Sequence, residues 1–307
     1  MHFLSVNDVS RDQINEIFDI ADEVAMGKTT VSLKENSTLA LLFEKPSTRT
    51  RVSLEVAMAR LGGKAIYIDT KTSQMRRGES LADTARVLSL YVDFIAARMD
   101  HHEDLLEFAN YSTVPVMNAL TDLEHPLQSL GDLYTIVNAK RKLKGLRIAF
   151  AGAISQNTCN SLMVAAVKMG AEMALIGPKE FPPNPQYLTR AREYGVVDIY
   201  ENMEDGLVNA DVIYTDTFAS STDTFENVGS KEQIEQKIKK FMKYQVNSKA
   251  LQYADKDVLV MHPLPAFRGQ EITADVLEGS KSIIWEQAKN KLLIEQAVLM
   301  YLSEKSL

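Results

Sequence analysis

The stretch Phe43-Glu44-Lys45-Pro46-Ser47-Thr48-Arg49-Thr50-Arg51 joins a predicted strand to a predicted helix. The apolar run at residues 39–43 is typical of a buried strand, and apolar residues recur at helical spacing over residues 52–61. A helix that begins here presents unpaired backbone N–H groups and the positive end of its dipole, beside several hydroxyls and two arginines. This pattern predicts a binding site for a phosphate dianion. The alternative is a capped helix start with two surface arginines.

The residues after this helix continue the same unit. A second strand is expected at residues 64–69, after the Gly62-Gly63 break, so that strand, helix and strand form a parallel unit. Residues 70–80, which include Gln74, form a loop too polar to be buried without a ligand. A short strand then ends at Arg98. Open α/β sheets place ligand contacts at the carboxyl ends of their strands, so we expect Arg98 to face the same ligand.

A histidine stands at the next entry into a helix. The strand expected at residues 114–119 leads to His125-Pro126-Leu127-Gln128, and a helix follows. A neutral imidazole N–H can polarise a carbonyl oxygen without transferring a proton, which makes His125 a candidate donor to the ligand. An ordinary residue at the start of a helix is the alternative interpretation.

The second half of the chain repeats the strand-to-helix pattern with different chemistry. The basic cluster at residues 140–144 marks the domain boundary, and the strand at residues 147–151 runs into the turn at Gly152. This turn lacks the three-glycine fingerprint of dinucleotide-binding folds, which disfavours a dehydrogenase. It offers the amide of Asn157 instead. Asp216 follows a strand at residues 212–215 and is expected to face the same crevice.

Two prolines surround Leu264 in the motif His262-Pro263-Leu264-Pro265, which ends a strand at residues 258–261. Prolines keep the backbone of Leu264 out of helix and sheet, so its carbonyl groups are free to accept hydrogen bonds from a ligand. A rigid turn without a function is the alternative. A long helix at residues 283–302 is expected to return to the first domain.

Length and composition limit the class of protein. The 307 residues exceed the usual size of one core, so two domains are expected, each a parallel sheet flanked by helices in an α/β fold. A net charge of −7 argues against a nucleic-acid partner held by bulk charge. The single cysteine excludes an internal disulfide, and no apolar run is long enough to span a membrane. The first residues do not resemble a signal peptide, so we expect a cytoplasmic protein.

Three ordered motifs resemble those of the carbamoyltransferases: Ser47-Thr48-Arg49-Thr50-Arg51, His125-Pro126-Leu127-Gln128 and His262-Pro263-Leu264-Pro265. The similarity runs over residues 4–303, and residues 78–86 and 244–249 resemble the ornithine branch of the family. The resemblance implies a carbamoyl phosphate-binding domain at residues 1–140 with a C-terminal helix at 287–307, and an amino-acid-binding domain at 141–286. It also implies a homotrimer, in which a loop from one subunit completes the neighbour's site, and chemistry without metal or cofactor.

The resemblance also implies roles for individual residues. The carbamoyl phosphate-binding residues by match of motif are Ser47, Thr48, Arg49, Thr50, Gln74, Arg98, His125, Gln128, Pro263, Leu264 and Lys291. The residues expected to be catalytic among them are Arg49, Arg98, His125 and Gln128. The residues that match the amino-acid site are Asn157, Asp216, Ser220 and Ser221.

Five positions depart from the ornithine branch. Pro263 replaces a cysteine, Lys291 replaces an arginine and Ala153 replaces an aspartate, while Ser221 and Thr222 replace methionine and glycine. The neutral Asn157 and the anionic Asp216 suit an ammonium group, which favours L-ornithine as acceptor, citrulline as product and a role in arginine metabolism. Putrescine, lysine and aspartate are alternative acceptors. A carbamoyltransferase-like binding protein with weakened catalysis is a further alternative.

Overall fold

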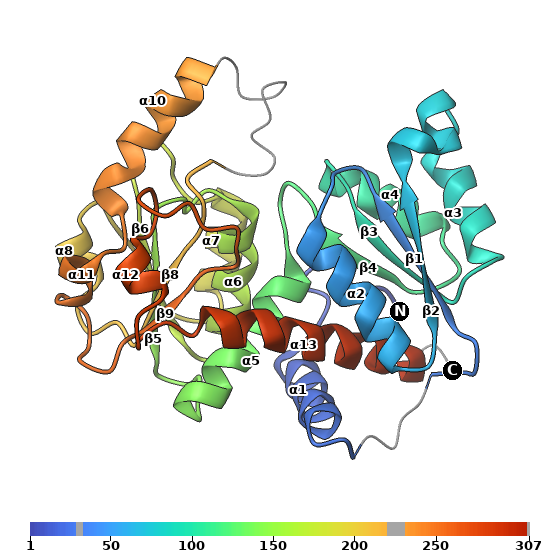
Figure 1. The fold of residues 1–307 in the computed structure, drawn as a ribbon, viewed down its shortest axis with the longest axis horizontal. Helices are drawn as coiled ribbons and strands as arrows, with labels where there is room; N and C mark the ends of the chain where they lie inside the picture. The colour runs from blue at the N-terminus through green and yellow to red at the C-terminus, as the bar shows by residue number, and fades with distance from the viewer. Residues whose placement is uncertain (29–32, 220–230, 306–307) are drawn as a thin grey trace. The chain divides into compact units, whose positions relative to one another are not determined.

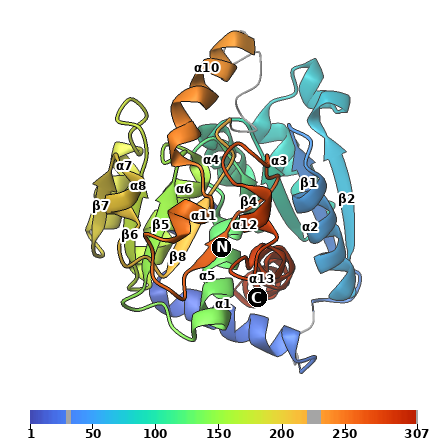
Figure 2. The ribbon, with the colours of Figure 1, turned by 60° about the vertical axis from the view of Figure 1, so that its left-hand side comes forward.

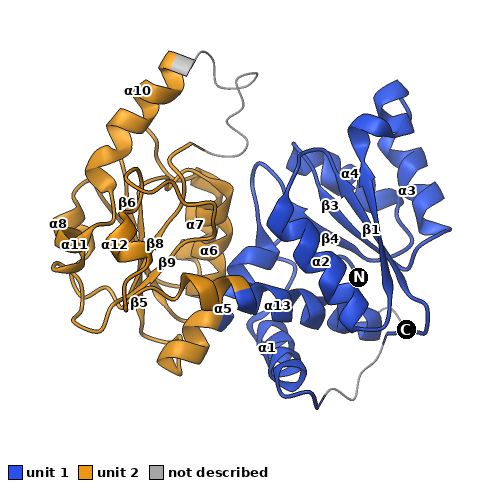
Figure 3. Cartoon of the chain, in the orientation of Figure 1, with its two compact units in different colours: residues 1–134, 289–307 blue, residues 135–288 orange. Residues whose placement is uncertain are grey.

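The structure is a computed structural model, and it describes residues 1–28, 33–219 and 231–305. The chain forms two compact units (Figure 3). Unit 1 comprises residues 1–134 and 289–307, and unit 2 comprises residues 135–288. Two long helices, α5 (Pro126–Lys140) and α13 (Ile284–Lys305), each contribute residues to both units.

Unit 1 is a parallel sheet with helices packed on it (Figure 1). Its remaining elements in chain order are α1 (Arg11–Ala25), β1 (Thr38–Phe43), α2 (Thr48–Arg60), β2 (Lys64–Asp69), the 3-10 turns η1 (Thr70–Thr72) and η2 (Gln74–Arg77), α3 (Leu81–Ser89), β3 (Phe94–Arg98), α4 (His102–Tyr111) and β4 (Val116–Leu120). Helix α1 begins at Arg11, because Ser10 and Gln13 form a capping box there.

The register of this sheet brings the two predicted anion-binding segments to one edge. The strand order is β2-β1-β3-β4 with all pairs parallel, and Phe43 at the end of β1 pairs with Arg98 at the end of β3. The amide of Glu44 then donates to the Arg98 carbonyl over 2.9 Å. The chain that follows β1 and the last residue of β3 are therefore neighbours. Helix α2 packs on the face formed by β1 and β2 (Figure 2).

Unit 2 is also built on a parallel sheet, in the order β7-β6-β5-β8-β9. Its elements are β5 (Arg147–Ala151), α6 (Asn157–Lys168), β6 (Glu172–Ile176), α7 (Pro185–Arg192), β7 (Val197–Tyr200), α8 (Met203–Gly206), β8 (Val212–Thr215), α10 (Lys231–Phe241), the 3-10 turn η3 (Met242–Tyr244), α11 (Ser248–Leu251), β9 (Leu259–Met261) and α12 (Ala274–Leu277).

The second sheet also aligns its strand ends. Ala151 of β5 pairs with Thr215 of β8, and Tyr214 pairs with Met261 of β9, so the segments after these three strands emerge at one edge. Gly152, the first residue after β5, has φ +103°, and a Cβ there would lie 2.6 Å from the Phe218 ring. Only glycine allows the turn after β5 to approach the turn after β8 this closely.

Each unit has its own apolar core. Leu42, Ile95 and Phe108 belong to the core of unit 1, and Ile176, Ile213 and Val260 belong to that of unit 2; all six are buried. The predicted α/β class is therefore confirmed, as is the C-terminal helix that joins the first unit. Within the described residues, no helix is long and apolar enough to cross a membrane.

Candidate active site

Helix α2 begins without the usual neutralising groups. Ser47 is its N-cap residue, but the Ser47 side chain makes no capping hydrogen bond, and the first turn holds no acidic residue. Arg49 is exposed and Thr50 is buried in that turn. The helix dipole and the guanidinium of Arg49 therefore both contribute positive potential at the start of α2, which favours the binding of an anion there.

The two arginines of the motif differ in their partners. The Nε atom of Arg51 donates to Glu55 over 2.8 Å, and its guanidinium stacks on the Tyr67 ring with 3.7 Å to the centroid. Arg51 is thus held on the surface of α2 by an ion pair and a cation–π contact. Of the two, Arg49 is the stronger candidate for binding an anion.

Arg98 lies buried at the end of β3, with 6% of its surface exposed. Burial, together with the charge of Arg49, lowers the pKa of its guanidinium to about 10, and Asp100 opposes this shift. Arg98 therefore stays protonated at neutral pH. Its Nε–H has no hydrogen-bond partner among the described residues. A buried cation with a donor left over is well suited to a polar or anionic ligand.

His125 and Gln128 are both buried at the start of α5. Burial lowers the pKa of the His125 imidazole well below its usual 6.5. Three nearby cations lower it further, namely Lys291, Arg98 and Arg49. The imidazole is therefore neutral near pH 7 and can donate to a carbonyl oxygen. The amide of Gln128 donates to Asp132 over 2.8 Å, which fixes its orientation.

Lys291 of α13 completes this cluster of cations. Its ammonium donates to the Thr50 hydroxyl over 2.8 Å, and only 6% of the residue is exposed. Gly131 explains how α13 comes so close to α5, because a Cβ at Gly131 would lie 3.2 Å from the Lys291 Cα. Three cations, a buried hydroxyl and a neutral imidazole thus gather at the start of α2, from four different elements of unit 1.

Gln74 is not part of this cluster within the subunit. It is exposed on η2, and its side chain forms no hydrogen bond or ion pair with any described residue. The 3-10 turn η2 belongs to the polar loop at residues 70–80, so Gln74 lies on an exposed loop.

In unit 2, Asp216 lies buried directly after β8. The Thr217 amide donates to its Oδ1 atom over 2.7 Å. Burial raises the pKa of the Asp216 carboxyl, and the His262 ring and the Thr217 amide oppose this shift. A buried carboxylate without a full counter-charge favours a cationic or amine ligand.

Asn157 begins helix α6 and is also buried. Its Oδ1 atom accepts from the Thr158 amide over 2.7 Å, which holds the side chain at the start of α6. Thr158 in turn favours the ionised form of Asp216. The structure thus brings Asn157 and Asp216 into one neighbourhood of unit 2, one neutral and one acidic.

The motif after β9 is held by a buried histidine. The Leu264 amide donates to His262 Nδ1 over 2.8 Å, so the ring proton is on Nε2, which lies 3.0 Å from the Glu271 carboxylate. Leu264 has φ +59°, and Pro263 beside it is half-buried. His262 and Glu271 therefore fix the turn that carries both candidate residues, in unit 2.

Two family models together match nearly the whole chain. The model described as the aspartate/ornithine carbamoyltransferase carbamoyl-P binding domain matches residues 1–138, and the model described as the Asp/Orn binding domain matches residues 144–302. The chain belongs to the aspartate/ornithine carbamoyltransferase family. The resemblance drawn from the three motifs is confirmed.

Relatives within this family match this chain over most of their own length. The ornithine carbamoyltransferase of Archaeoglobus fulgidus is 42% identical over 99% of this chain and 98% of its own. The anabolic ornithine carbamoyltransferase of Pyrococcus furiosus is 43% identical over 87% of this chain and 84% of its own. A solved structure of the Pyrococcus furiosus ornithine carbamoyltransferase superimposes with a TM-score of 0.90, at 40% identity, covering 97% of this chain and 95% of that one.

Two predicted residues are not described by the structure, and one buried residue near the site was not predicted. Ser220 and Ser221, together with Thr222, fall outside the described residues. Sequence reasoning missed Glu295, a fully buried carboxylate on α13. The signal available for Glu295 was its spacing of four residues from Lys291 in an otherwise apolar stretch of helix.

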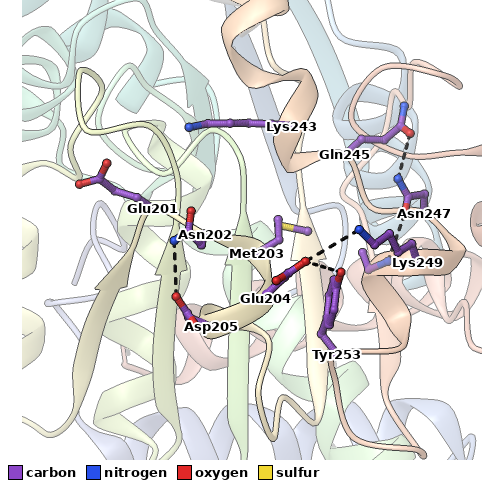
Figure 4. Close-up of a pocket in the computed structure, with 11 residues that line it drawn as sticks. Glu201, Asn202, Met203, Glu204, Asp205, Lys243, Gln245, Asn247, Lys249 and Tyr253 are labelled. Atoms are coloured by element: carbon purple, nitrogen blue, oxygen red, sulfur yellow. Dashed lines mark hydrogen bonds and ion pairs between the residues drawn. The ribbon is translucent and has the colours of Figure 1, made fainter.

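A polar pocket in unit 2 contains none of the predicted site residues (Figure 4). It has a volume of about 430 Å³ and is lined by residues of α8, η3 and α11 and of the segments beside them. Its polar groups pair with one another, because the Tyr253 hydroxyl donates to Glu204 over 2.6 Å and Lys249 lies 3.8 Å from the same carboxylate. Among the described residues, no group of acidic, histidine or cysteine side chains could hold a metal ion.

Proposed function

We propose that this chain transfers the carbamoyl group from carbamoyl phosphate to the side-chain amine of L-ornithine, giving citrulline and phosphate in arginine metabolism. The observation that carries the proposal is the cluster of Arg49, Arg98, Lys291, Thr50 and neutral His125 at the start of α2. Three cations suit a dianionic phosphate, and a neutral donor suits the carbamoyl oxygen.

Each group has a distinct part in the proposed reaction. Ser47, Thr48, Arg49 and Thr50 would hold the phosphate with the α2 backbone amides. The amine attacks the carbonyl carbon, and the developing oxyanion is stabilised by Arg98, His125 and Thr50. The C–O bond to phosphate then breaks, the amine nitrogen gives up a proton that the departing phosphate takes up, and the charge of Arg49 stabilises the leaving phosphate dianion. Gln128, Pro263, Leu264 and Lys291 are proposed to position the carbamoyl end.

Unit 2 is proposed to hold the acceptor. A buried carboxylate beside a neutral amide suits an ammonium group, so Asp216 and Asn157 would bind the amino acid together with Ser220 and Ser221. The relatives named as ornithine carbamoyltransferases support ornithine over aspartate, which would need cationic partners for its second carboxylate. We therefore assign carbamoyl phosphate binding to residues 1–140 with 287–307, and acceptor binding to residues 141–286.

The exposed position of Gln74 supports a shared site. Because its side chain meets no described group of its own subunit, we propose that it completes the site of a neighbour in a homotrimer. Sedimentation analysis would test the assembly. We also propose that the protein works in the cytoplasm, since it has a single cysteine, which is buried, and therefore no internal disulfide.

A comparison of acceptors tests the proposed function. The rate of phosphate release from carbamoyl phosphate would be measured with ornithine, putrescine, lysine and aspartate. Ornithine should give the highest kcat/KM. A higher value for another amine would reassign the acceptor, and binding of carbamoyl phosphate without turnover of any acceptor would indicate a binding protein.

A further inference from the structure

A carboxylate stands directly behind the anion-binding cluster of unit 1. The Glu295 side chain is fully buried on α13, one helical turn after Lys291, and its Oε1 atom lies 3.6 Å from the Lys291 ammonium. The Lys291 ammonium and the Ser53 hydroxyl both favour the ionised form of this carboxylate, although neither Glu295 oxygen makes a hydrogen bond of normal geometry among the described residues. The Lys291 ammonium also donates to the Thr50 hydroxyl at the start of α2. Lys291 therefore links a buried carboxylate to the proposed phosphate site.

Burial acts on both members of this pair. It lowers the pKa of Lys291, against the attraction of Glu295, and the cations Arg98 and Arg49 lower it further. Burial raises the pKa of Glu295 to about 7, against the attraction of Lys291. A carboxylic acid that ionises near neutral pH is unusual, and here it adjoins a site for a doubly charged ligand.

The backbone that carries Lys291 is packed closely against α5. Gly131 of α5 packs so closely on α13 that a single added carbon would lie 3.2 Å from the Lys291 Cα. The backbone that carries Lys291 is thus fixed against α5. A change of charge at Thr50 therefore acts on a buried pair whose backbone stays in place, which favours a change in its protonation.

We propose that the Lys291–Glu295 pair takes up a proton from solvent when the phosphate group of carbamoyl phosphate binds at Thr50. The proton goes to the Glu295 carboxylate, so that the pair changes from neutral to singly positive, and it returns to solvent when phosphate leaves. The inference deepens the proposed function and depends on it for the position of the anion. A dianion beside Lys291 stabilises the ammonium and destabilises the carboxylate behind it.

The other charged groups that face the pair do not replace Glu295 in this exchange above neutral pH. Arg49 and Arg98 are already protonated, and the neighbouring His125 is neutral with a pKa well below 6.5. Anion affinity should therefore fall by up to about tenfold per pH unit above pH 7.

Calorimetry with sulfate measures this proton directly. Sulfate is a dianion that does not itself titrate near neutral pH, and its binding heat would be measured at about pH 7.5 in two buffers with different ionisation enthalpies. The wild-type protein should take up a large fraction of one proton per bound sulfate. The double variant Lys291→Arg with Glu295→Gln keeps a cation and removes both titrating groups, so it should bind sulfate without proton uptake.

A matched control is available on α1, which contacts the exposed end of α13. Glu16 pairs with Lys305 of α13 over 2.8 Å at the exposed end, so Glu16→Gln makes the same chemical change away from the anion site. It should leave the proton uptake unchanged. Zero uptake by the wild-type protein, or equal uptake by the wild-type protein and the double variant, would overturn the inference.

Inhibition kinetics separate this inference from the proposed function. Sulfate should compete with carbamoyl phosphate in the transfer assay. Competition without proton uptake would contradict only the role of Glu295. Sulfate that fails to bind, or binds without competing, would contradict the anion site itself and the inference with it.

Discussion

The Lys291 ammonium lies 2.8 Å from the Thr50 hydroxyl, although 241 residues separate the two in the chain. This hydrogen bond joins the C-terminal helix to the helix start from which the fold was predicted. Through this bond α13 places a buried cation at the start of α2, beside Arg49 and Arg98. Such a concentration of like charge is stable only with counter-charges, which Glu295 and a bound anion provide.

Replacement of Arg49 should impair turnover without harming the fold. Arg49 is exposed, so Arg49→Ala removes charge from the anion site and little packing. The loss of a charged contact to a desolvated anion is expected to reduce transition-state stabilisation by about 2 to 4 kcal/mol, measured as kcat/KM for carbamoyl phosphate.

Arg51→Ala is the matched control for this change. Arg51 lies on the same helix but is engaged by Glu55 and Tyr67. Its replacement should change kcat/KM much less than that of Arg49. If both variants lose activity equally, the distinction between the two arginines is wrong.

Replacement of Asp216 should affect the acceptor alone. Asp216→Asn keeps the shape of the side chain and removes its charge, so carbamoyl phosphate affinity should stay unchanged while acceptor kcat/KM falls by roughly 30-fold or more. The Thr217 amide can donate to either side chain, so the local turn should survive. Near-normal ornithine kinetics would indicate that Asp216 only caps the turn and would reopen the identity of the acceptor.

Gly131 should tolerate no side chain. In Gly131→Ala the new methyl group would lie 3.2 Å from the Lys291 backbone, which cannot rotate away as a side chain could. We expect α5 and α13 to separate slightly, with a loss of about 1 to 3 kcal/mol in the free energy of unfolding and weaker anion binding. Urea unfolding and sulfate titration measure the two effects. A variant that is more stable than wild type, with unchanged sulfate affinity, would show that the helices have room.

The neutral state of His125 should make the fold sensitive to acid. The pKa of His125 is lowered in the folded protein, so below about pH 6.5 the unfolded chain binds a proton that the folded chain does not. Stability should therefore fall as the pH drops below 6.5. His125→Gln removes this contribution, so the difference in unfolding free energy between wild type and variant should shift in favour of the variant between pH 7.5 and about pH 5.5 in sulfate- and phosphate-free buffer. A difference that is constant over this range would mean that His125 already carries a proton in the folded state.

The residues at the carboxyl ends of the strands could be predicted from the sequence more fully than the buried charged residues. Residues 39–51 and Arg98 could be placed because an apolar strand followed by polar residues has a definite geometry in a parallel sheet. The same reasoning applied to Asp216 after β8. Pairing within the described sheets places each of these segments at the end of its strand, as expected.

Other features depend on contacts that no local pattern reveals. The role of Glu271 follows from a turn that folds it back onto His262, nine residues earlier. Glu295 lies in an apolar stretch where a single charged residue is normally exposed, and only the packing of α13 shows that it is buried behind Lys291. From the sequence, Gly131 is only a residue of low helix propensity, and its role follows from the close approach of α13. These residues share one property: each depends on a neighbouring element of the fold.

Carbamoyl transfer itself is the measurement that tests the proposed function most directly. The purified protein would be mixed with carbamoyl phosphate labelled with ¹³C at the carbonyl carbon, with ornithine and aspartate supplied together, and the products followed by NMR. We predict that the label appears in the ureido carbon of citrulline, with one phosphate released for each citrulline formed. Label found mainly in carbamoyl aspartate, or phosphate released with no carbamoylated product, would contradict the assignment.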